Sequence, residues 1–338
     1  KRYRMSMLVP PELSTATPGA NEIAHGFEAG RAPELHHIQA VLDRLAPEPT
    51  TARNLRWSSV FRISHRIAGA YSGGRAFIAG DAAHIHPPTG AQGMNTGIQD
   101  AVNLAWKLAA AVDGTAAPGL LDSYDAERRP VGEEVVGRPV KAAATGIRID
   151  STDPFHAVRR EAQLLVGYRG SPIVGPVDGT VPDGAPQAGD RAPDARGLVR
   201  DIVQFPIRLL ASTEALRSTE LFELLRAPGH TVLVYAESDT TAATIDDVVA
   251  ATREALGDDV HAYAVLTGLV DAPDLQAPSV RDAAGAFREA YAAADGTVLL
   301  VRPDGYLGHR GTVADVAGIA GYAALVAAPA GSRVPVAG

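Results

Sequence analysis

The stretch GDAAHIHPPTGAQGMNTGIQDAVNLAWKL, residues 80–108, constrains the fold more than any other part of this chain. An acid follows a short apolar segment, a loop rich in Gly and Pro comes next, and a long amphipathic run closes the stretch. Glycines let backbone approach a ligand closely because they lack a Cβ atom, while Pro87 and Pro88 stiffen the loop. The order of strand, acid, loop and helix N-terminus is a recurring way to hold an anionic or electron-rich ligand.

The amphipathic run predicts a long helix. Thr96 and Gln99 fit a capping box, so we expect the helix to begin at about Asn95 or Thr96, and Gly114 is placed to end it. The apolar residues recur at helical spacing and predict the face turned toward the core. That face consists of Ile98, Ala101, Val102, Ala105, Leu108, Ala109 and Val112.

Several elements are predicted before the motif. Residues 34–45 have helical spacing, and Pro47 stops the run. The alternation in LRWSSVFRI, residues 55–63, predicts a strand. GGRAFIAGD predicts a turn and a short buried strand from Ala76 to Ala79. The opening residues also alternate like a half-buried strand, so we expect that further residues precede Lys1.

After the motif, LLDSYDAERR predicts a second helix that breaks at Pro130, and a further helical region runs to about Leu165. Gly and Pro are dense in residues 167–193, which is typical of a linker or an extended surface segment. The strings TVLVYA, VHAYAVLT and TVLLVR then predict short strands, with helices at about 241–256 and 312–327. This last part is predicted to be a small α/β domain.

Composition narrows the class of protein. The net charge of −8 comes from 31 Lys and Arg against 39 Asp and Glu spread along the chain, so no basic stripe favours nucleic acid. No apolar run approaches the roughly 18 to 20 residues that span a bilayer, which predicts no membrane span. The absence of cysteine excludes disulfides and thiol redox chemistry, and a cytoplasmic location is the expectation.

Plainer interpretations of the same residues remain open. The loop could simply cap a helix, and GAQGMNTG is not a GxGxxG dinucleotide fingerprint. Asp81, His84 and His86 could be metal ligands, but their spacing supplies no further ligand, so we expect no metal site. Trp57 and Trp106 are more typical of core residues than of substrate-stacking groups.

The ERR string at 127–129, with Asp125, is expected to form a solvated helix face with local ion pairs. On this interpretation these charged side chains have no part in a site.

As a whole, residues 80–108 resemble the second flavin-binding motif of the FAD-dependent aromatic hydroxylases, the single-component monooxygenases related to p-hydroxybenzoate and phenol hydroxylases. GGRAFIAGD and LLDSYDAERRPVG are similar to the same family, and LVRPDGYLGHRG, residues 300–311, resembles the thioredoxin-like C-terminal domain of its phenol hydroxylase and polyketide hydroxylase branches.

The resemblance implies an α/β fold with α+β elements: the latter part of a p-hydroxybenzoate hydroxylase-like pair of FAD and substrate domains, followed by a thioredoxin-like domain. The implied boundaries are 1–72 for the later part of the substrate-binding domain and 73–166 for the C-terminal part of the FAD-binding domain. A linker at 167–193 and the thioredoxin-like domain at 194–338 follow.

The resemblance also implies roles for individual residues. Asp81 would contact the ribityl chain of FAD, and Pro88, Gly90 and the backbone of Gly93, Met94 and Asn95 would lie along the isoalloxazine ring. Arg66 matches the approximate place of an arginine that contacts the nicotinamide cofactor, while Trp57 and Pro87 would face the substrate. No catalytic acid or base is implied.

The implied activity is hydroxylation of a phenolic or polyketide aromatic ring, with FAD, NADPH or NADH, and O2, through a flavin C4a-hydroperoxide. The GxGxxG unit that holds the ADP half of FAD in this family is not in the sequence, so a homodimer or companion chain could supply that half. A noncatalytic assembly module derived from such a hydroxylase is the alternative, and Baeyer–Villiger or epoxidising chemistry would use the same flavin site.

Overall fold

The computed structural model describes residues 3–6, 33–59, 66–85, 92–145, 155–175, 181–200, 218–238, 240–267 and 274–329. Contacts between residues divide the chain into two compact units, Lys1–Arg66 and Ile67–Gly338.

The first unit contains the helix predicted before Pro47. Helix α1 spans Leu35–Leu45, and the backbone N–H of Glu34 donates to Nδ1 of His37 at 3.1 Å at its start. None of its side chains is buried within the structure. The predicted helix is confirmed, but its apolar residues form no core.

The strand predicted at 55–63 is wrong over the part that can be compared. Residues 55–59 have no regular secondary structure, and 60–63 lie outside the described residues. An alternating sequence becomes a strand only when a neighbouring strand accepts its backbone hydrogen bonds, and none of the described strands pairs with residues 55–59.

Short strands and one turn precede the long helix. Strands β1 and β4 form one two-stranded sheet, while β2 and β3 form an antiparallel hairpin. The 3-10 turn η2 lies directly before β4. Their bounds are Arg66–Ile67 for β1, Ser72–Gly73 for β2, Ala76–Phe77 for β3, Gly80–Ala82 for η2 and His84–Ile85 for β4.

The prediction of a buried strand at Ala76–Ala79 is wrong in its length and in its burial. Strand β3 ends at Phe77, its first residue is exposed and its second is half-buried. A two-stranded hairpin buries one face at most, so its residues stay partly in solvent.

Helix α2 spans Gly93–Val112, which puts its start two to three residues before the predicted one. The predicted capping box is wrong: Thr96 lies inside the helix, where its fully buried Oγ1 donates to the carbonyl of Gln92 at 2.9 Å. Gly114, with φ of +70°, follows the helix end as predicted.

Most of the predicted core-facing residues of α2 are exposed, although Leu108 packs against a small apolar cluster with Tyr71 and Tyr124. Within the structure Ile98 is 54% exposed, Val102 47% and Val112 64%. The buried side chains instead are mostly polar or charged: Thr96, Asp100, Asn103, Leu104 and Lys107. The helix therefore turns its polar face inward, where hydrogen bonds and ion pairs must satisfy it.

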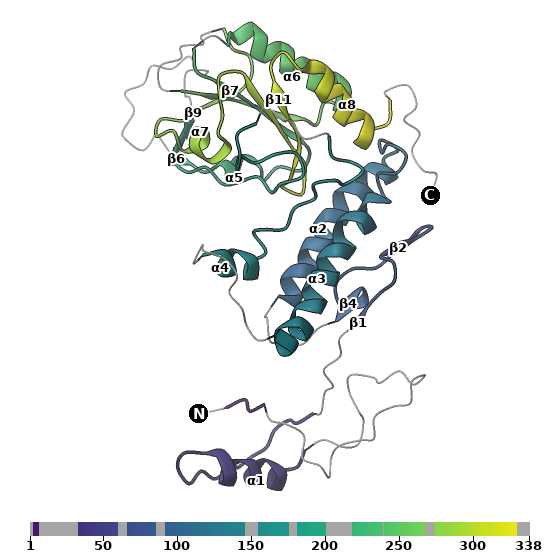
Figure 1. The fold of residues 1–338 in the computed structure, drawn as a ribbon, viewed down its shortest axis with the longest axis vertical. Helices are drawn as coiled ribbons and strands as arrows, with labels where there is room; N and C mark the ends of the chain where they lie inside the picture. The colour runs from purple at the N-terminus through teal and green to yellow at the C-terminus, as the bar shows by residue number, and fades with distance from the viewer. Residues whose placement is uncertain are drawn as a thin grey trace. The chain divides into compact units, whose positions relative to one another are not determined.

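Helix α3 spans Ser123–Thr145 without interruption, so the predicted break at Pro130 is wrong. Pro130 is exposed, and a proline on the outer side of a long helix removes a backbone hydrogen bond without disturbing the packed side. Helices α2 and α3 lie side by side (Figure 1).

Helix α4, His156–Glu161, is short. Most of the described residues between 166 and 197 have no regular structure, as a Gly- and Pro-rich segment predicts, but Tyr168 and Ile173 are buried. The backbone N–H of Gly189 donates to the carbonyl of Leu307 at 2.7 Å, which ties this segment to the C-terminal sheet.

The C-terminal part is a seven-stranded mixed sheet in the order β11-β10-β7-β8-β9-β5-β6. Strands β7 and β8 are parallel, and β10 pairs antiparallel with both β7 and β11. The strand bounds are Leu198–Arg200 for β5, Ser218–Thr219 for β6, Thr231–Ala236 for β7, His261–Leu266 for β8, Ser279–Arg281 for β9, Thr297–Val301 for β10 and Leu307–Thr312 for β11.

Helices cover both faces of this sheet (Figure 1). Helices α6 and α8 cover one face, and α5 and α7 cover the other. Their bounds are Leu221–Leu224 for α5, Ala242–Leu256 for α6, Ala286–Tyr291 for α7 and Val316–Val326 for α8. The three strands and two helices predicted for this region are confirmed, with ends shifted by a few residues.

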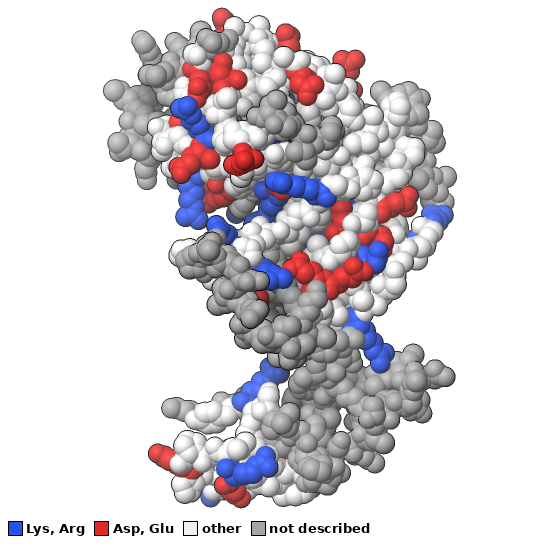
Figure 2. Space-filling view, viewed as in Figure 1, with Lys and Arg blue, Asp and Glu red and all other residues white. Residues whose placement is uncertain are grey.

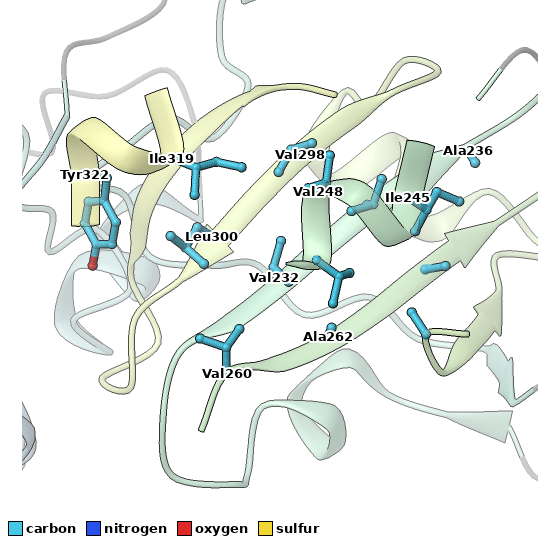
Figure 3. Close-up of a cluster of buried hydrophobic side chains, with 14 of the residues drawn as sticks. Val232, Ala236, Ile245, Val248, Val260, Ala262, Val298, Leu300, Ile319 and Tyr322 are labelled. Atoms are coloured by element: carbon cyan, nitrogen blue, oxygen red, sulfur yellow. The ribbon is translucent and has the colours of Figure 1, made fainter. Parts of the chain in front are cut away.

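Apolar side chains fill both interfaces. On one face, Val232 and Leu300 of the sheet pack with Val248 of α6 and Ile319 of α8 (Figure 3). On the other face, Leu233 and Leu299 pack with residues of α5 and α7. Neighbouring residues of a strand point to opposite faces, so continuous apolar runs predict a sheet that is covered on both sides.

Within the part of the chain that the structure describes, no helix combines the length and the apolar content that crossing a bilayer requires. On the face that Figure 2 shows, acidic and basic side chains are interspersed.

Candidate functional site

The motif folds into a tight turn packed against the first turns of α2. Gly80 has φ of +58°, a conformation that glycine adopts without strain. A Cβ atom built on Gly97 would lie 3.0 Å from Cα of Gly80, so the two backbones touch. Glycine at position 97 therefore permits the close approach of η2 to the helix, and glycine at position 80 permits the positive φ of the turn.

Asp81 occupies the middle of this turn and is exposed. Its carboxylate therefore faces solvent beside the start of a helix. A carboxylate in this position can accept hydrogen bonds from the hydroxyl groups of a ligand.

The N-terminus of α2 is formed by Gln92, Gly93, Met94 and Asn95. Met94 and Asn95 are exposed, and the Gln92 side chain at the N-cap does not bond to the first turn. It donates instead to the Glu161 side chain at the end of α4. The first backbone N–H groups of a helix carry partial positive charge and favour an anionic group.

Beneath the turn, the fully buried Asp100 receives three hydrogen bonds. Its Oδ2 accepts from the backbone N–H of Gly80 at 3.1 Å and from Nε2 of His84 at 2.8 Å. Its Oδ1 accepts from Nε of Arg128 at 2.7 Å. Burial alone would raise the pKa of Asp100, but the His84 hydrogen bond and the Arg128 charge outweigh it and lower the pKa below its ordinary value.

Arg128 joins this carboxylate to helix α3. Its guanidinium, fully buried, also donates to the hydroxyl of Tyr168 at 2.9 Å and to the carbonyl of Thr96 at 3.2 Å. One side chain thus connects α3, the start of α2 and the segment after α4.

A second buried ionic cluster lies further along the same helices. The Glu127 carboxylate accepts from Nη1 and Nη2 of Arg302 at 2.7 and 2.8 Å and from Nζ of Lys107 at 2.8 Å. Asn103 and Ser171 also donate to it, each at 2.7 Å. The Arg302 and Lys107 charges overcome the effect of burial and lower the pKa of Glu127.

Arg302 belongs to the turn between β10 and β11, so this cluster joins α2 and α3 to the C-terminal sheet. Its guanidinium lies 5.4 Å from the ring centroid of Trp106 and 5.4 Å from that of Tyr168. Burial lowers the pKa of Lys107 to about 8 despite the nearby Glu127. Buried charges thus add directional contacts to an interface where Trp106 and Leu120 also pack against the apolar core of the sheet.

The predicted site residues fall into three groups. Asp81, Gly93, Met94 and Asn95 lie on η2 and the start of α2, which pack together. Pro87, Pro88 and Gly90 lie outside the described residues, as does His86.

The remaining predicted site residues are Arg66 and Trp57. Arg66 is exposed in β1. Trp57 belongs to the first unit and is 71% exposed, so the expectation that it is a core residue is wrong. Trp106 is partly buried and packs against the core of the sheet, as expected.

The residues of the ionic clusters are absent from the predicted site. The expectation that 127–129 form a solvated face is wrong for Glu127 and Arg128, which are buried, and holds for Arg129, which pairs with Asp125 at 3.4 Å. The sequence shows that a polar face exists on α2 but not that it is buried. Polar residues recur on α2 at helical spacing opposite the apolar stripe: Thr96, Asp100, Asn103 and Lys107.

A pocket elsewhere in the structure and the possible metal site do not add to the candidate site. A pocket of about 300 Å³ lies between α3 and residues 165–171, and none of the predicted site residues lines it. Among the described residues, no group of three or more His, Asp or Glu side chains is arranged to hold a metal ion.

Residues 25–138 match the model of the family described as FAD binding domain. The chain is 33% identical over 269 residues to a flavin-dependent monooxygenase of Mycobacteroides abscessus, an alignment that covers 79% of this chain and 44% of that protein. It is also 33% identical over 308 residues to a 4-methyl-5-nitrocatechol 5-monooxygenase of a Burkholderia species, which covers 87% of this chain and 49% of that one.

Among solved structures, the chain resembles aklavinone-11 hydroxylase in a ternary complex with FAD and aklavinone. The TM-score is 0.56 at 28% sequence identity, and the match covers 79% of this chain and 45% of that one. The chain thus spans about half the length of the curated relatives that it matches. From the FAD-binding match, the two monooxygenase relatives and this structural likeness, we conclude that the chain belongs to the family of FAD-dependent aromatic hydroxylases.

Proposed function

We propose that this chain forms the part of a flavin-dependent monooxygenase that holds the ribityl and ring portions of FAD. The observation that carries the proposal is the exposed carboxylate of Asp81, on a turn that packs against the start of α2. A hydroxyl acceptor next to a helix N-terminus fits the polyol chain and electron-rich ring of a flavin.

In this proposal Asp81 accepts hydrogen bonds from ribityl hydroxyls. The first N–H groups of α2, at Gly93, Met94 and Asn95, stabilise negative charge on the pyrimidine edge of the ring. Pro88 and Gly90 would line the ring, Arg66 would contact the nicotinamide cofactor, and Trp57 and Pro87 would face the substrate.

The reaction that we propose is hydroxylation of an aromatic ring in a phenolic or polyketide substrate, with O2 and with NADPH or NADH as the reductant. Relatives named as a nitrocatechol monooxygenase and an aklavinone hydroxylase support this substrate class. When bound, the flavin would supply the activation of O2. The protein residues would orient the flavin and exclude water.

The ADP half of FAD needs a βαβ unit, which we propose is supplied by sequence outside these 338 residues, on the same chain or on a companion. The apolar stripe of α2 supports this proposal because it is exposed in the structure: Ile98, Val102 and Val112 are about half-exposed or more. Exposed apolar stripes of this kind are typical of interfaces.

The C-terminal domain is proposed to be thioredoxin-like. The parallel β7-α6-β8 unit next to the β10-β11 hairpin and helix α8 supports this assignment. Since the chain has no cysteine, the domain would serve packing or dimer formation rather than thiol chemistry.

A noncatalytic assembly module is the second candidate, and the exposed apolar stripe of α2 is the observation that favours it. Titration with FAD of the protein that includes the ADP-binding half, followed by flavin fluorescence, separates the two. Saturable binding that weakens in Asp81→Ala supports the flavin site, whereas a folded protein that contains both halves and binds no FAD supports the assembly module.

A further inference from the structure

The turn that carries Asp81 is anchored from below by one buried carboxylate. Asp100, on the inward face of α2, accepts from the backbone N–H of Gly80, directly before Asp81. It also accepts from His84, the first residue of β4. The two hydrogen bonds therefore hold the turn on either side of Asp81.

Two further contacts restrict the position of the turn. A Cβ atom on Gly97 would already lie 3.0 Å from Gly80, so the turn is seated directly on α2. The backbone N–H of Ala83 donates to the carbonyl of Gly80 at 2.8 Å, which closes the turn on itself. Moving the Gly80 amide away from Asp100 would thus displace the whole turn.

Joining a turn to a helix through a buried ionised carboxylate carries a desolvation penalty, because both Asp100 and Arg128 lose their hydration. An apolar contact would avoid this penalty, but it would not fix a direction, whereas a hydrogen-bonded carboxylate does. The use of a carboxylate here therefore favours a requirement for a defined geometry at the turn.

We propose that Asp100 is a positioning residue, which fixes the Gly80–Ala82 turn so that the Asp81 carboxylate is presented to the ribityl chain of FAD. This inference rests on the proposed function. Arg128 supports it by pairing with Asp100 and by tying it to Tyr168 and to the Thr96 carbonyl.

The first test needs no flavin. In Asp100→Asn, one side of the carboxylate becomes an NH2 donor: it faces either Gly80 and His84, which lose their acceptor, or Nε of Arg128, which repels it. Either orientation disturbs the contact that holds the turn. Hydrogen exchange of the full chain, followed by mass spectrometry, should show the segment 79–85 exchanging at least about tenfold faster. Strand β7, in the core of the sheet, is the internal reference and should not change.

Glu127→Gln is the matched control, since Glu127 is also a buried carboxylate paired with arginine but contacts no atom of the turn. Exchange of 79–85 should stay unchanged in this variant. Equal acceleration in both variants, or none in Asp100→Asn, would overturn the inference.

The second test measures the dissociation constant of FAD in the full chain. Asp100→Asn should raise it by about tenfold or more, and Asp81→Ala should raise it too. If Asp81→Ala weakens FAD binding and Asp100→Asn does not, the inference fails while the proposed function stands. If Asp81→Ala leaves FAD binding intact, the proposed function fails and the inference with it.

A further variant keeps the test decisive if Asp100→Asn does not fold. Gly97→Ala leaves every charge in place but pushes against Cα of Gly80, so it should weaken FAD binding several-fold although alanine favours a helix. Gly137→Ala, in α3, is its control because a Cβ atom there meets nothing within 4 Å. Equal FAD affinity in the two glycine variants would contradict the inference.

Discussion

The C-terminal sheet and the α2-α3 pair are stabilised in different ways. Both faces of the sheet are filled by apolar side chains such as Leu233 and Leu300. The helix pair instead buries charges, with Asp100 and Arg128 near one end and Glu127, Lys107 and Arg302 farther along. The candidate flavin site lies on the helix pair, the part where directional interactions set the geometry.

The two regions should therefore respond differently when a buried side chain is removed. Apolar contacts have no preferred direction, and the stability lost on truncating an apolar side chain scales with the volume of the cavity that is left. An ionic cluster is sensitive to the loss of any one partner, because the remaining charges stay buried with fewer opposite charges around them.

The largest loss of stability is expected from Glu127→Ala. Two buried cations, Lys107 and Arg302, would lose their shared acceptor, and the free energy of unfolding should fall by about 3–5 kcal/mol. Urea unfolding measures it. Glu133→Ala, an exposed acid on the same helix, is the control and should change stability by less than about 0.5 kcal/mol. A similar small change in both variants would contradict the ionic description of the helix pair.

A somewhat smaller loss, about 3 kcal/mol, is expected from Leu299→Ala in the centre of β10. Leu299 is fully buried, and the variant would leave a cavity in the apolar core beside α5 and α7. The same unfolding experiment measures this loss, with the partly exposed Val316→Ala as its control. An Leu299→Ala effect no greater than that of the control would mean that this face is loosely packed.

Asp81→Ala should affect binding rather than folding. Loss of an exposed carboxylate changes stability little, while FAD affinity should fall by about tenfold, or 1.4 kcal/mol. Asp113→Ala removes an acid from the other end of the same helix and should leave FAD affinity unchanged. Equal loss of stability and of affinity in Asp81→Ala would identify Asp81 as structural.

Acid should weaken the ionic region selectively. Asp100 and Glu127 have pKa values below those of the unfolded chain. Their contribution to stability is therefore fully present above the unfolded values of 3.8 and 4.5 and is lost as pH falls below them toward the folded values. Unfolding measured between pH 6 and about pH 3 should show a smaller pH dependence in Glu127→Gln than in the unchanged chain. An identical pH dependence would contradict the prediction.

The smallest effect is expected on the exposed stripe of α2. Ile98→Gln should change the free energy of unfolding of this chain by less than about 0.5 kcal/mol, because Ile98 is about half-exposed. A loss above about 2 kcal/mol would show that the apolar face of α2 is part of a core after all.

Local patterns predicted strands β7, β8 and β10 of the sheet correctly, but not β5, β6, β9 or β11. In TVLVYA, and in TVLLV of residues 297–301, every residue is apolar or β-branched, which favours central strands covered on both sides. The same reasoning failed for residues 55–59, because alternation says nothing about whether a partner strand is present.

The orientation of α2 was not predictable from its own residues. Periodicity separates a polar face from an apolar face, and the usual assumption puts the apolar face inside. Here Asp100 and Lys107 find buried partners on α3, twenty or more positions away in the sequence. Pairs at such separation leave no local pattern.

The sequence by itself determined the family, the loop and helix that carry the candidate site, and the layered C-terminal sheet, because short motifs and apolar periodicity are local properties of the chain. Tertiary structure alone decided which face of α2 is buried, that Glu127 and Arg128 are not on the surface, and that Asp100 lies beneath the turn of Asp81. Those outcomes depend on which distant charges meet, and the energy of a buried charge is set by its partners rather than by its neighbours in sequence.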